Sequence, residues 1–473
     1  MMMSVSELTR RHLLGRSLSG LGGMALASLL EGTSPAKPGM VGLPHHEPKA
    51  KRVICLFMSG GFSQFESFDY KPLLKKRQGE DLPKSVRAGH AVVGMSKNQA
   101  VLPLVGSKFE FKQHGESGAW CSSLFPHLAG VVDELAFVQS LKSDAVNHDP
   151  ALTFLQTGAQ LPGRPSMGAW LSYGLGSECE DLPAFIVLVS KRPVDQPLSS
   201  RLWDSGFLPT QHQGVQFRSG KEPVLYLNNP NGVPLEANAR MLAALRSVQT
   251  AAHQLPEREI SARIEQYEMA CRMQTSVPEA TNLSGEPDSV KKLYGEDVEK
   301  VGSFAANCLV ARRLAERGVR FIQLFHPGWD HHGGLPEAFE MGAREVDQPC
   351  AALIQDLKQR DMLKDTLVLF VSEFGRTCYS QGRIAKSGSY GREHHRDCFT
   401  AWLAGGGVKR GQVFGSTDEF GYQVAENPVS VHDLHATMLH LLGIDHERFT
   451  FFFQGRDFRL TDVFGTVQRE LLA

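Results

Sequence analysis

Two short stretches of the sequence concentrate imidazole and carboxylate side chains. One contains Asp330, His331 and His332, and the other contains His394 and His395. Neutral imidazole and carboxylate are the usual protein ligands of Zn²⁺ and similar ions. Each stretch adjoins an apolar run typical of a buried strand, and strand ends are where an α/β fold places its chemistry. The pattern favours a metal-assisted hydrolase site; the alternative is a solvated polar loop or a set of histidines that hydrogen-bond one another.

Two further segments follow strand-like apolar runs and offer additional ligands. Glu66 and Asp69 lie after a glycine-containing turn near the start of the chain, and Glu373 and Arg376 follow a later run. A carboxylate can coordinate a metal, and a guanidinium can clamp a pair of anionic oxygens. We therefore expect the three carboxylates to be metal ligands and Arg376 to contact an anion.

A fourth segment has the features of a helix start. Asn147 and His148 precede Pro150, and proline suits the first turn of a helix. A helix N-terminus presents unpaired N–H groups and a positive dipole end, which favour an anion such as phosphate or sulfate. We expect Asn147 and His148 to lie at that anion site, whereas Asp149 is expected only to cap the helix.

A divalent ion held by these residues would assist ester hydrolysis. It would polarise a P–O or S–O oxygen and lower the pKa of its water to about 7, and two ions about 4 Å apart would stabilise both the attacking and the leaving oxygen. Adjacent residues on extended backbone point in opposite directions, so one histidine of each pair is expected to be a ligand. The candidate metal ligands are Glu66, Asp69, Asp330, His331, His332, Glu373, His394 and His395.

Apolar runs alternate with helical patterns along most of the chain. Continuous apolar runs are typical of strands buried on both faces, as in parallel sheets. The alternation predicts an α/β fold, a three-layer sandwich with a mostly parallel central sheet. The expected strands are residues 53–58, 135–138, 184–189, 319–325, 366–371 and 399–403. The expected helices are residues 151–157, 167–175, 301–317, 338–359 and 431–442.

Composition indicates one large globular domain, expected at residues 51–473. The hydrophobic content of 42% and the charged content of 21% are ordinary for such a domain, and the net charge of -1 gives no reason to expect nucleic acid as a partner. The eight cysteines include no CxxC pair, which argues against a disulfide scaffold. Residues from about 193 to 290 interrupt the alternation and predict a cap-like insertion or, alternatively, a peripheral addition.

Residues 1–34 have the features of an export signal. Arg10 and Arg11 precede a glycine-rich apolar run at residues 18–30, which is too short for a convincing membrane span. The paired arginines indicate a twin-arginine signal, and the alternatives are an ordinary Sec signal or an N-terminal anchor. Residues 35–50 are expected to be a linker. We expect export to the periplasm or the cell exterior, with no stable membrane span after the signal is removed.

Ten motifs in a fixed order carry a resemblance to a known family. They are residues 10–11, 58–61, 68–72, 147–150, 329–332, 373–377, 394–395, 404–407, 431–437 and 454–457. Together they resemble the exported bacterial proteins grouped as domain of unknown function 1501, a family placed near the alkaline phosphatase and sulfatase superfamily. The resemblance covers nearly the whole chain after the signal.

The resemblance implies roles for individual residues. Glu373 occupies the acid position of the superfamily's Asp-His metal pair, and His395, or His394, occupies the position of its last metal histidine. His148 stands near the position of the sulfatase nucleophile, and Ser59 stands where the superfamily has an aspartate ligand. These replacements leave three outcomes: His148 is itself the nucleophile or a ligand, a metal-bound hydroxide attacks directly, or the site only binds.

At the level of function, the resemblance implies an exported metal-dependent hydrolase of phosphate or sulfate esters. The cofactor would be one or two divalent ions, Zn²⁺ or Ca²⁺, and the substrate an anionic small molecule or a polysaccharide ester. The alternative is a non-catalytic extracytoplasmic binding or assembly protein on the same fold. Hydrolysis of an amide is less favoured, because the sequence has no HExxH motif.

Overall fold

The computed structural model describes most of the chain after the predicted export signal. The residues outside the description are 1–38, 41, 88–91, 93, 193–197, 221, 225–226, 228–236, 238–239, 242, 245–246, 248–256 and 386–387. The predicted signal at residues 1–34 and part of the predicted insertion at about 193–290 therefore lie outside the described residues.

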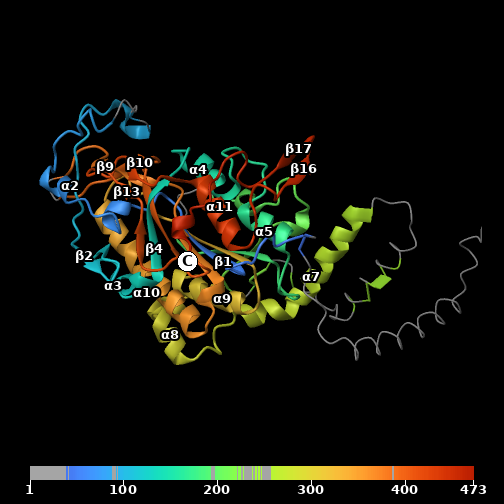
Figure 1. Cartoon of the computed structure of the whole chain (residues 1–473). Coiled ribbons are helices and arrows are strands. Elements are labelled where there is room, and N and C mark those ends of the chain that lie inside the picture. The colour runs from blue at the N-terminus through green and yellow to red at the C-terminus, as the bar shows by residue number, and fades with distance from the viewer. Residues whose placement is uncertain are drawn as a thin grey trace, which may run out of the picture.

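A nine-stranded sheet forms the centre of the molecule (Figure 1). Its strands are β1 (Arg52–Met58), β4 (Leu135–Lys142), β5 (Phe185–Val189), β6 (Val215–Phe217), β7 (Phe321–His326), β8 (Thr366–Val371), β11 (Phe399–Ala404), β12 (Gln412–Phe414) and β15 (Val429–Ser430). Their order is β12-β4-β11-β8-β1-β7-β5-β6, with β15 also paired to β4. Only β11 runs antiparallel to its neighbours, β4 and β8. The predicted mostly parallel sheet is therefore confirmed.

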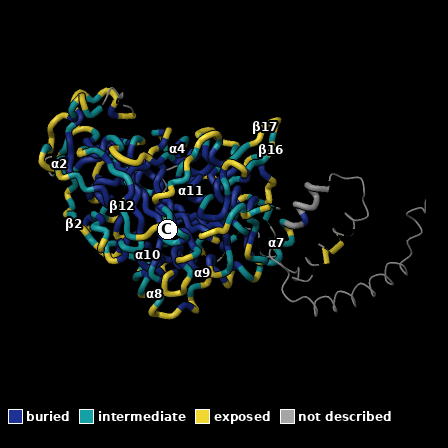
Figure 2. The backbone as a smooth tube through the Cα atoms, in the orientation of Figure 1, coloured by how far each residue is buried: buried dark blue, intermediate teal, exposed yellow. Residues whose placement is uncertain are grey.

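Helices cover both faces of this sheet. One layer contains α9 (Phe304–Glu316) and α10 (Leu335–Gln359), and the other contains α4 (His148–Thr157), α5 (Met167–Leu175) and α11 (Val431–Leu441) (Figure 1). Alternate residues of β1 enter the two apolar cores: Ile54 packs with the first layer and Val53 with the second. Figure 2 shows this buried interior between exposed outer surfaces. The predicted three-layer sandwich is thus also confirmed.

Short helices and two-stranded pairs lie around the central sheet. The short helices are α2 (Pro72–Lys76), α3 (Pro126–Ala129) and α8 (Asp288–Tyr294), and the short strand pairs are β2 (Phe111–His114) with β3 (Ala119–Ser122), β13 (Ser416–Thr417) with β14 (Val424–Glu426), and β16 (Phe451–Phe453) with β17 (Arg456–Phe458). One further pair is β9 (Gly375–Ser380) with β10 (Arg392–His395). Neither strand is among the strands predicted from the sequence, because both carry polar rather than apolar runs.

The described part of the insertion is mainly an addition at one side of the sheet. Strand β6 pairs with β5 at the sheet edge, and the long helix α7 (Glu257–Thr281) contacts α9. In Figure 1, α7 extends away from β9 and β10. Only the segment around Arg201 approaches the start of α4, where it forms an ion pair with Asp149. Whether the whole insertion is a cap or a peripheral addition stays a prediction.

Two further expectations concern the membrane and the cysteines. No helix among the described residues is both long and apolar enough to cross a membrane. All eight cysteines are free thiols, and six of them are buried. Most of them are therefore small core residues and form no scaffold.

Candidate metal centre

The sheet topology brings four distant segments to one edge. Strands β1, β7 and β8 are parallel neighbours, so the segments that follow them emerge together. Strand β11 is antiparallel to β8, so β11 begins at the edge where β8 ends. The segment before β11 therefore also lies at this edge. The residues that converge there are Ser59 to Gly61 after β1, Asp330 to His332 after β7, Glu373 after β8 and His394 in β10, ahead of β11.

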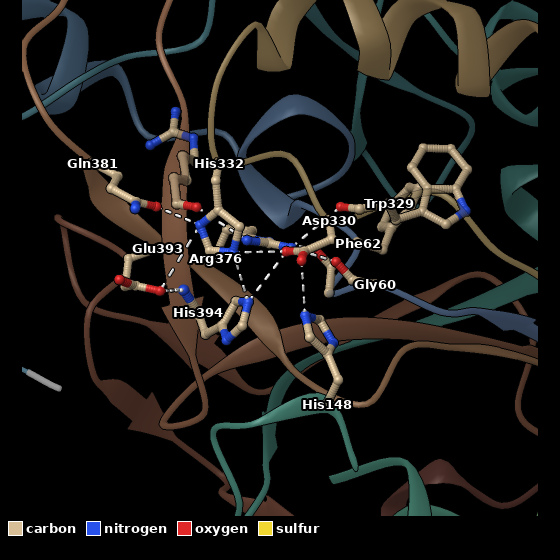
Figure 3. Close-up of polar contacts among 12 residues, drawn as sticks. Gly60, Phe62, His148, Trp329, Asp330, His332, Arg376, Gln381, Glu393 and His394 are labelled. Atoms are coloured by element: carbon tan, nitrogen blue, oxygen red, sulfur yellow. Dashed lines mark hydrogen bonds and ion pairs between the residues drawn. The ribbon is translucent and has the colours of Figure 1, made fainter. Parts of the chain in front are cut away.

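Asp330 lies at the centre of a cluster of three histidines (Figure 3). Its Oδ1 is 2.9 Å from Nε2 of His332 and 3.2 Å from Nε2 of His394, and these two nitrogens are 3.0 Å apart. Its Oδ2 is 3.2 Å from Nε2 of His148. The four side chains are between 11% and 21% exposed, so the cluster is partly open to solvent.

The second nitrogen of each ring fixes its orientation. Nδ1 of His394 donates to the Val146 carbonyl oxygen at 2.9 Å, and Nδ1 of His332 donates to Gln381 Oε1. Nδ1 of His148 donates to Glu373 Oε1 at 2.6 Å. A histidine that donates through Nδ1 presents Nε2 as the metal-binding lone pair, and such partners are typical of metal ligands. Three Nε2 atoms therefore face the carboxylate of Asp330.

Negative charge exceeds positive charge in this cluster. Three carboxylates, of Asp330, Glu373 and Glu393, lie here with one guanidinium, that of Arg376. The excess is two negative charges when all the imidazoles are neutral, and one when His148 is protonated. Glu373 and Glu393 are buried, and burial of a carboxylate costs free energy unless positive charge or hydrogen bonds compensate it. A divalent cation would neutralise this excess. The donor set and its charge therefore fit a metal ion.

The pKa values of His148 and Asp330 also show that the cluster stabilises positive charge. Burial by itself lowers the pKa of His148, but hydrogen bonds and charges from Asp330 and Glu373 raise it to about 9. Burial raises the pKa of Asp330, but its contacts with the three histidines and with Arg376 outweigh this and hold its pKa well below the usual range. The pKa of His394 is lowered, mainly by burial, so its imidazole is neutral.

A comparison with protein families identifies the chain. Residues 50–472 match the family described as "Protein of unknown function (DUF1501)". The chain belongs to this family. The family predicted from the sequence motifs is therefore confirmed, and the match spans the whole fold around the cluster. A comparison with curated proteins gives no match.

Solved structures to which the DUF1501 chain is similar include three bacterial proteins. The PsFucS1 sulfatase from Pseudoalteromonas sp. is 14% identical with a TM-score of 0.33, over 91% of this chain and 73% of that one. An alkaline phosphatase superfamily protein from Vibrio parahaemolyticus is 11% identical with a TM-score of 0.35, over 87% and 69%. The C-terminal periplasmic domain of EcEptC from Escherichia coli, in complex with Zn, is 8% identical with a TM-score of 0.35, over 88% of each chain.

Arg376 does not have the role expected from the sequence. Its side chain is fully buried and donates to the carbonyl oxygens of Gly61 and Arg392 and to Asp330 Oδ1. The expectation that it contacts an anion is wrong in this structure, because a guanidinium without exposed surface cannot meet a ligand from solvent.

Glu373 and Asn147 lie beside the cluster. Glu373 Oε1 accepts hydrogen bonds from His148 Nδ1 and, at 2.9 Å, from the Gly60 N–H. We therefore correct its expected role from metal ligand to the carboxylate that orients His148. Asn147 is the exposed N-cap residue of α4 and makes no side-chain capping hydrogen bond.

Two predicted acidic ligands lie in other networks. Glu66 forms a fully buried ion pair with Arg392 at 2.8 Å, and it also accepts a hydrogen bond from the Tyr390 hydroxyl. Asp69 pairs with Lys71 at 3.1 Å and accepts a hydrogen bond from Thr417. Both assignments as metal ligands are corrected, because each carboxylate already has a cation as its partner.

One histidine of each adjacent pair points away from the cluster. His331 packs against the rings of Trp329 and Phe339, and burial lowers its pKa to about 3, with Arg376 acting in the same direction. His395 donates through Nε2 to the Tyr422 carbonyl oxygen at 2.7 Å. These two assignments as ligands are therefore corrected in favour of His332 and His394.

Sequence patterns missed two residues of the site. Glu393 is buried, and its carboxylate lies near His332 and His394 as a potential third ligand. Gln381 orients His332 from the end of β9. Glu393 stands next to His394 in the chain, so its position was a usable signal, whereas nothing in the sequence around Gln381 indicates its contact.

Gly60 is required where the segment after β1 meets the segment after β7. Its φ is +121°, and an added Cβ would lie 2.6 Å from the Asp330 nitrogen and 2.7 Å from the Trp329 nitrogen. We expect Gly60→Ala to lower the free energy of unfolding by more than about 2 kcal/mol. The backbone strain of a side chain at positive φ and the steric overlap with the neighbouring backbone both destabilise the folded state. Gly220→Ala is the control, since Gly220 has a φ of +122° and open space around it. If urea unfolding shows the same loss of stability in Gly60→Ala and Gly220→Ala, this prediction is wrong.

Proposed function

We propose that this protein binds a divalent metal ion through Asp330, His332 and His394 and hydrolyses phosphate or sulfate esters there. The observation that supports the proposal is the convergence of three imidazole Nε2 atoms on one carboxylate, with an excess of negative charge. The cluster is partly exposed, as a site for an external substrate must be.

The donor set favours Zn²⁺ over Ca²⁺. Zn²⁺ accepts imidazole nitrogen and carboxylate oxygen at tetrahedral sites, whereas Ca²⁺ takes six to eight oxygen ligands. His332 and His394 supply the nitrogens and Asp330 Oδ1 supplies an oxygen. His148 and Oδ2 of Asp330 lie next to this position and offer donors for a second ion. Metal analysis distinguishes one bound ion from two.

The chain's own residues determine what happens to the substrate. When bound, the ion would withdraw charge from an ester oxygen and acidify a water molecule. His148 is held by Glu373 with its Nε2 towards the cluster. With one ion bound, it can hold a proton at that atom and donate it to a leaving oxygen; with two ions, the same nitrogen would be a metal ligand and could not hold the proton. Ser59 is fully buried and does not offer an exposed hydroxyl nucleophile. We therefore propose that water, rather than a side-chain hydroxyl, attacks the ester.

The proposal includes export. The twin-arginine-type pattern at residues 1–34 supports it, and an anionic small molecule or polysaccharide ester outside the cytoplasm would be the substrate. Fractionation of cells that produce the full chain should place the shortened protein in the periplasm or the medium. Replacement of Arg10 and Arg11 by lysine should retain it in the cytoplasm, and continued export would contradict the twin-arginine route.

Metal analysis and a substrate screen test the enzymatic proposal. Purified protein should contain one or two equivalents of zinc or a similar metal, and it should hydrolyse aryl phosphates or aryl sulfates. Chelation should remove both the metal and the activity, and added Zn²⁺ should restore them. A metal-free protein that takes up no ion and turns over neither ester would defeat the proposal.

Glu373→Gln should separate metal binding from turnover. The amide keeps the size of the side chain but removes the charge that stabilises a protonated His148. We expect kcat/KM to fall about 10–100-fold while metal content is retained, because Glu373 contacts His148 and not the proposed ion. Steady-state kinetics with metal analysis of the same sample measure both. Loss of the metal would instead make Glu373 a ligand.

One observation favours a second candidate, a binding protein without turnover. Arg376, the expected anion clamp, is fully buried and occupied by protein acceptors. Metal and anion binding by calorimetry, with no hydrolysis of any ester tested, would support this alternative.

A further inference from the structure

We infer that Arg376 is a positioning residue that fixes Asp330 and the backbone around it for metal binding, an inference that rests on the proposed metal site. Arg376 lies in β9, opposite His394 of β10 in the strand register. Its guanidinium is buried between three segments that are far apart in the chain. A group in that place determines how these segments sit relative to one another.

The hydrogen bonds of Arg376 occupy each nitrogen of the guanidinium. Nε donates to the Gly61 carbonyl oxygen at 2.7 Å, and Nη1 donates to the Arg392 carbonyl oxygen at 3.0 Å. Nη2 donates to the carbonyl oxygens of Gly60 and Trp329. Arginine is suited to this role because its planar, always charged group presents five N–H donors in a fixed arrangement. The side chain thus ties the segments after β1 and β7 to β10.

The remaining contact connects Arg376 to the proposed metal site. Nη2 donates to Asp330 Oδ1 at 2.6 Å, and the same oxygen faces Nε2 of His332 and of His394. The guanidinium therefore sets the direction from which this oxygen approaches a metal. It also places a positive charge within hydrogen-bond distance of this oxygen. Both effects are typical of groups that orient metal ligands from behind.

The same geometry argues against contact with substrate. Arg376 has no exposed surface, and its partners are protein oxygens from three segments. An anion could reach the guanidinium only if Asp330 or the turn at Gly60 moved away. Substitution of Arg376 is therefore expected to change the affinity for the metal ion. It should have no direct effect on the affinity for an anion.

Arg376→Lys tests the inference, with Arg312→Lys as the matched control. Arg312 is also a buried arginine, paired with Glu286 and Asp356 in the helical layer around α9, away from the cluster. We expect Arg376→Lys to lower Co²⁺ affinity about 10–100-fold, the usual effect of losing a group that orients a ligand, and to change the visible Co²⁺ absorption bands. Arg312→Lys should destabilise the fold but leave affinity and spectrum unchanged.

The outcomes separate this inference from the proposed function. Wild-type Co²⁺ binding with unchanged affinity and spectrum in Arg376→Lys would overturn the positioning role alone. No Co²⁺ binding by the wild-type protein would overturn the proposed function and this inference together. If Arg376→Lys does not fold, a crystal structure of the wild-type protein with Zn²⁺ and sulfate shows whether Arg376 contacts Asp330 or the anion. The guanidinium should remain on Asp330, and a guanidinium bound to sulfate would overturn the inference.

Discussion

Asp330→Asn should abolish metal binding and, with it, ester hydrolysis. Both carboxylate oxygens face imidazole Nε2 atoms, so this one side chain is shared by all three histidines of the cluster. The amide removes a negative charge and turns one oxygen into an N–H donor, which cannot bind a cation. We expect the dissociation constant to rise by more than about 100-fold, since even residues behind the ligands cost about 10–100-fold. Calorimetric titration with Zn²⁺ measures this change.

Thermal unfolding gives a second measurement of the same prediction. A ligand that binds only the folded state stabilises it by about 2.7 kcal/mol at 100 times its dissociation constant. Zn²⁺ should therefore raise the Tm of the wild-type protein and leave that of Asp330→Asn unchanged. Asp69→Asn is the control, because Asp69 was also a candidate ligand but pairs with Lys71 instead. Loss of metal binding in Asp69→Asn, or its retention in Asp330→Asn, would contradict the structure of the site.

The fold and the general location of the site follow from the sequence. The apolar runs of β1, β7 and β8 predict parallel strands, and their carboxyl ends must then meet at one edge. Residues 366–371 and 167–175 match β8 and α5 at both ends. Helix α4 begins three residues before the predicted position, at His148, because Pro150 occupies its first turn. That shift places His148 on the helix itself.

The roles of individual side chains depend on contacts that no local pattern contains. Glu66 and Glu373 both follow strands of the sheet, yet Glu66 pairs with Arg392 and Glu373 accepts from His148. These partners lie 326 and 225 positions away in the sequence, so only the folded chain selects them. Arg376 shows the same limit. Its charge predicts an anion, but burial gives it carbonyl oxygens as partners.

His394→Ala should weaken metal binding and His395→Ala should leave it unchanged, although the residues are adjacent. On strand β10 they point in opposite directions. Nε2 of His394 faces Asp330, and its Nδ1 is held by the Val146 carbonyl oxygen. Loss of this imidazole removes one of the nitrogen donors, and we expect the Zn²⁺ affinity to fall by more than about 100-fold. Titration of each variant with Co²⁺ measures its metal affinity.

His395→Ala should instead affect stability. Its Nε2 donates to the Tyr422 carbonyl oxygen, and its ring stacks on Tyr422 with centroids 4.6 Å apart. Removal should cost about 1–3 kcal/mol in urea unfolding, because a buried acceptor loses its donor. Metal affinity should stay at the wild-type value. The reverse pattern, with His395→Ala unable to bind metal and His394→Ala unaffected, would require β10 to shift by one residue. Since such a shift turns every side chain of a strand to its other face, the pair also tests the strand register.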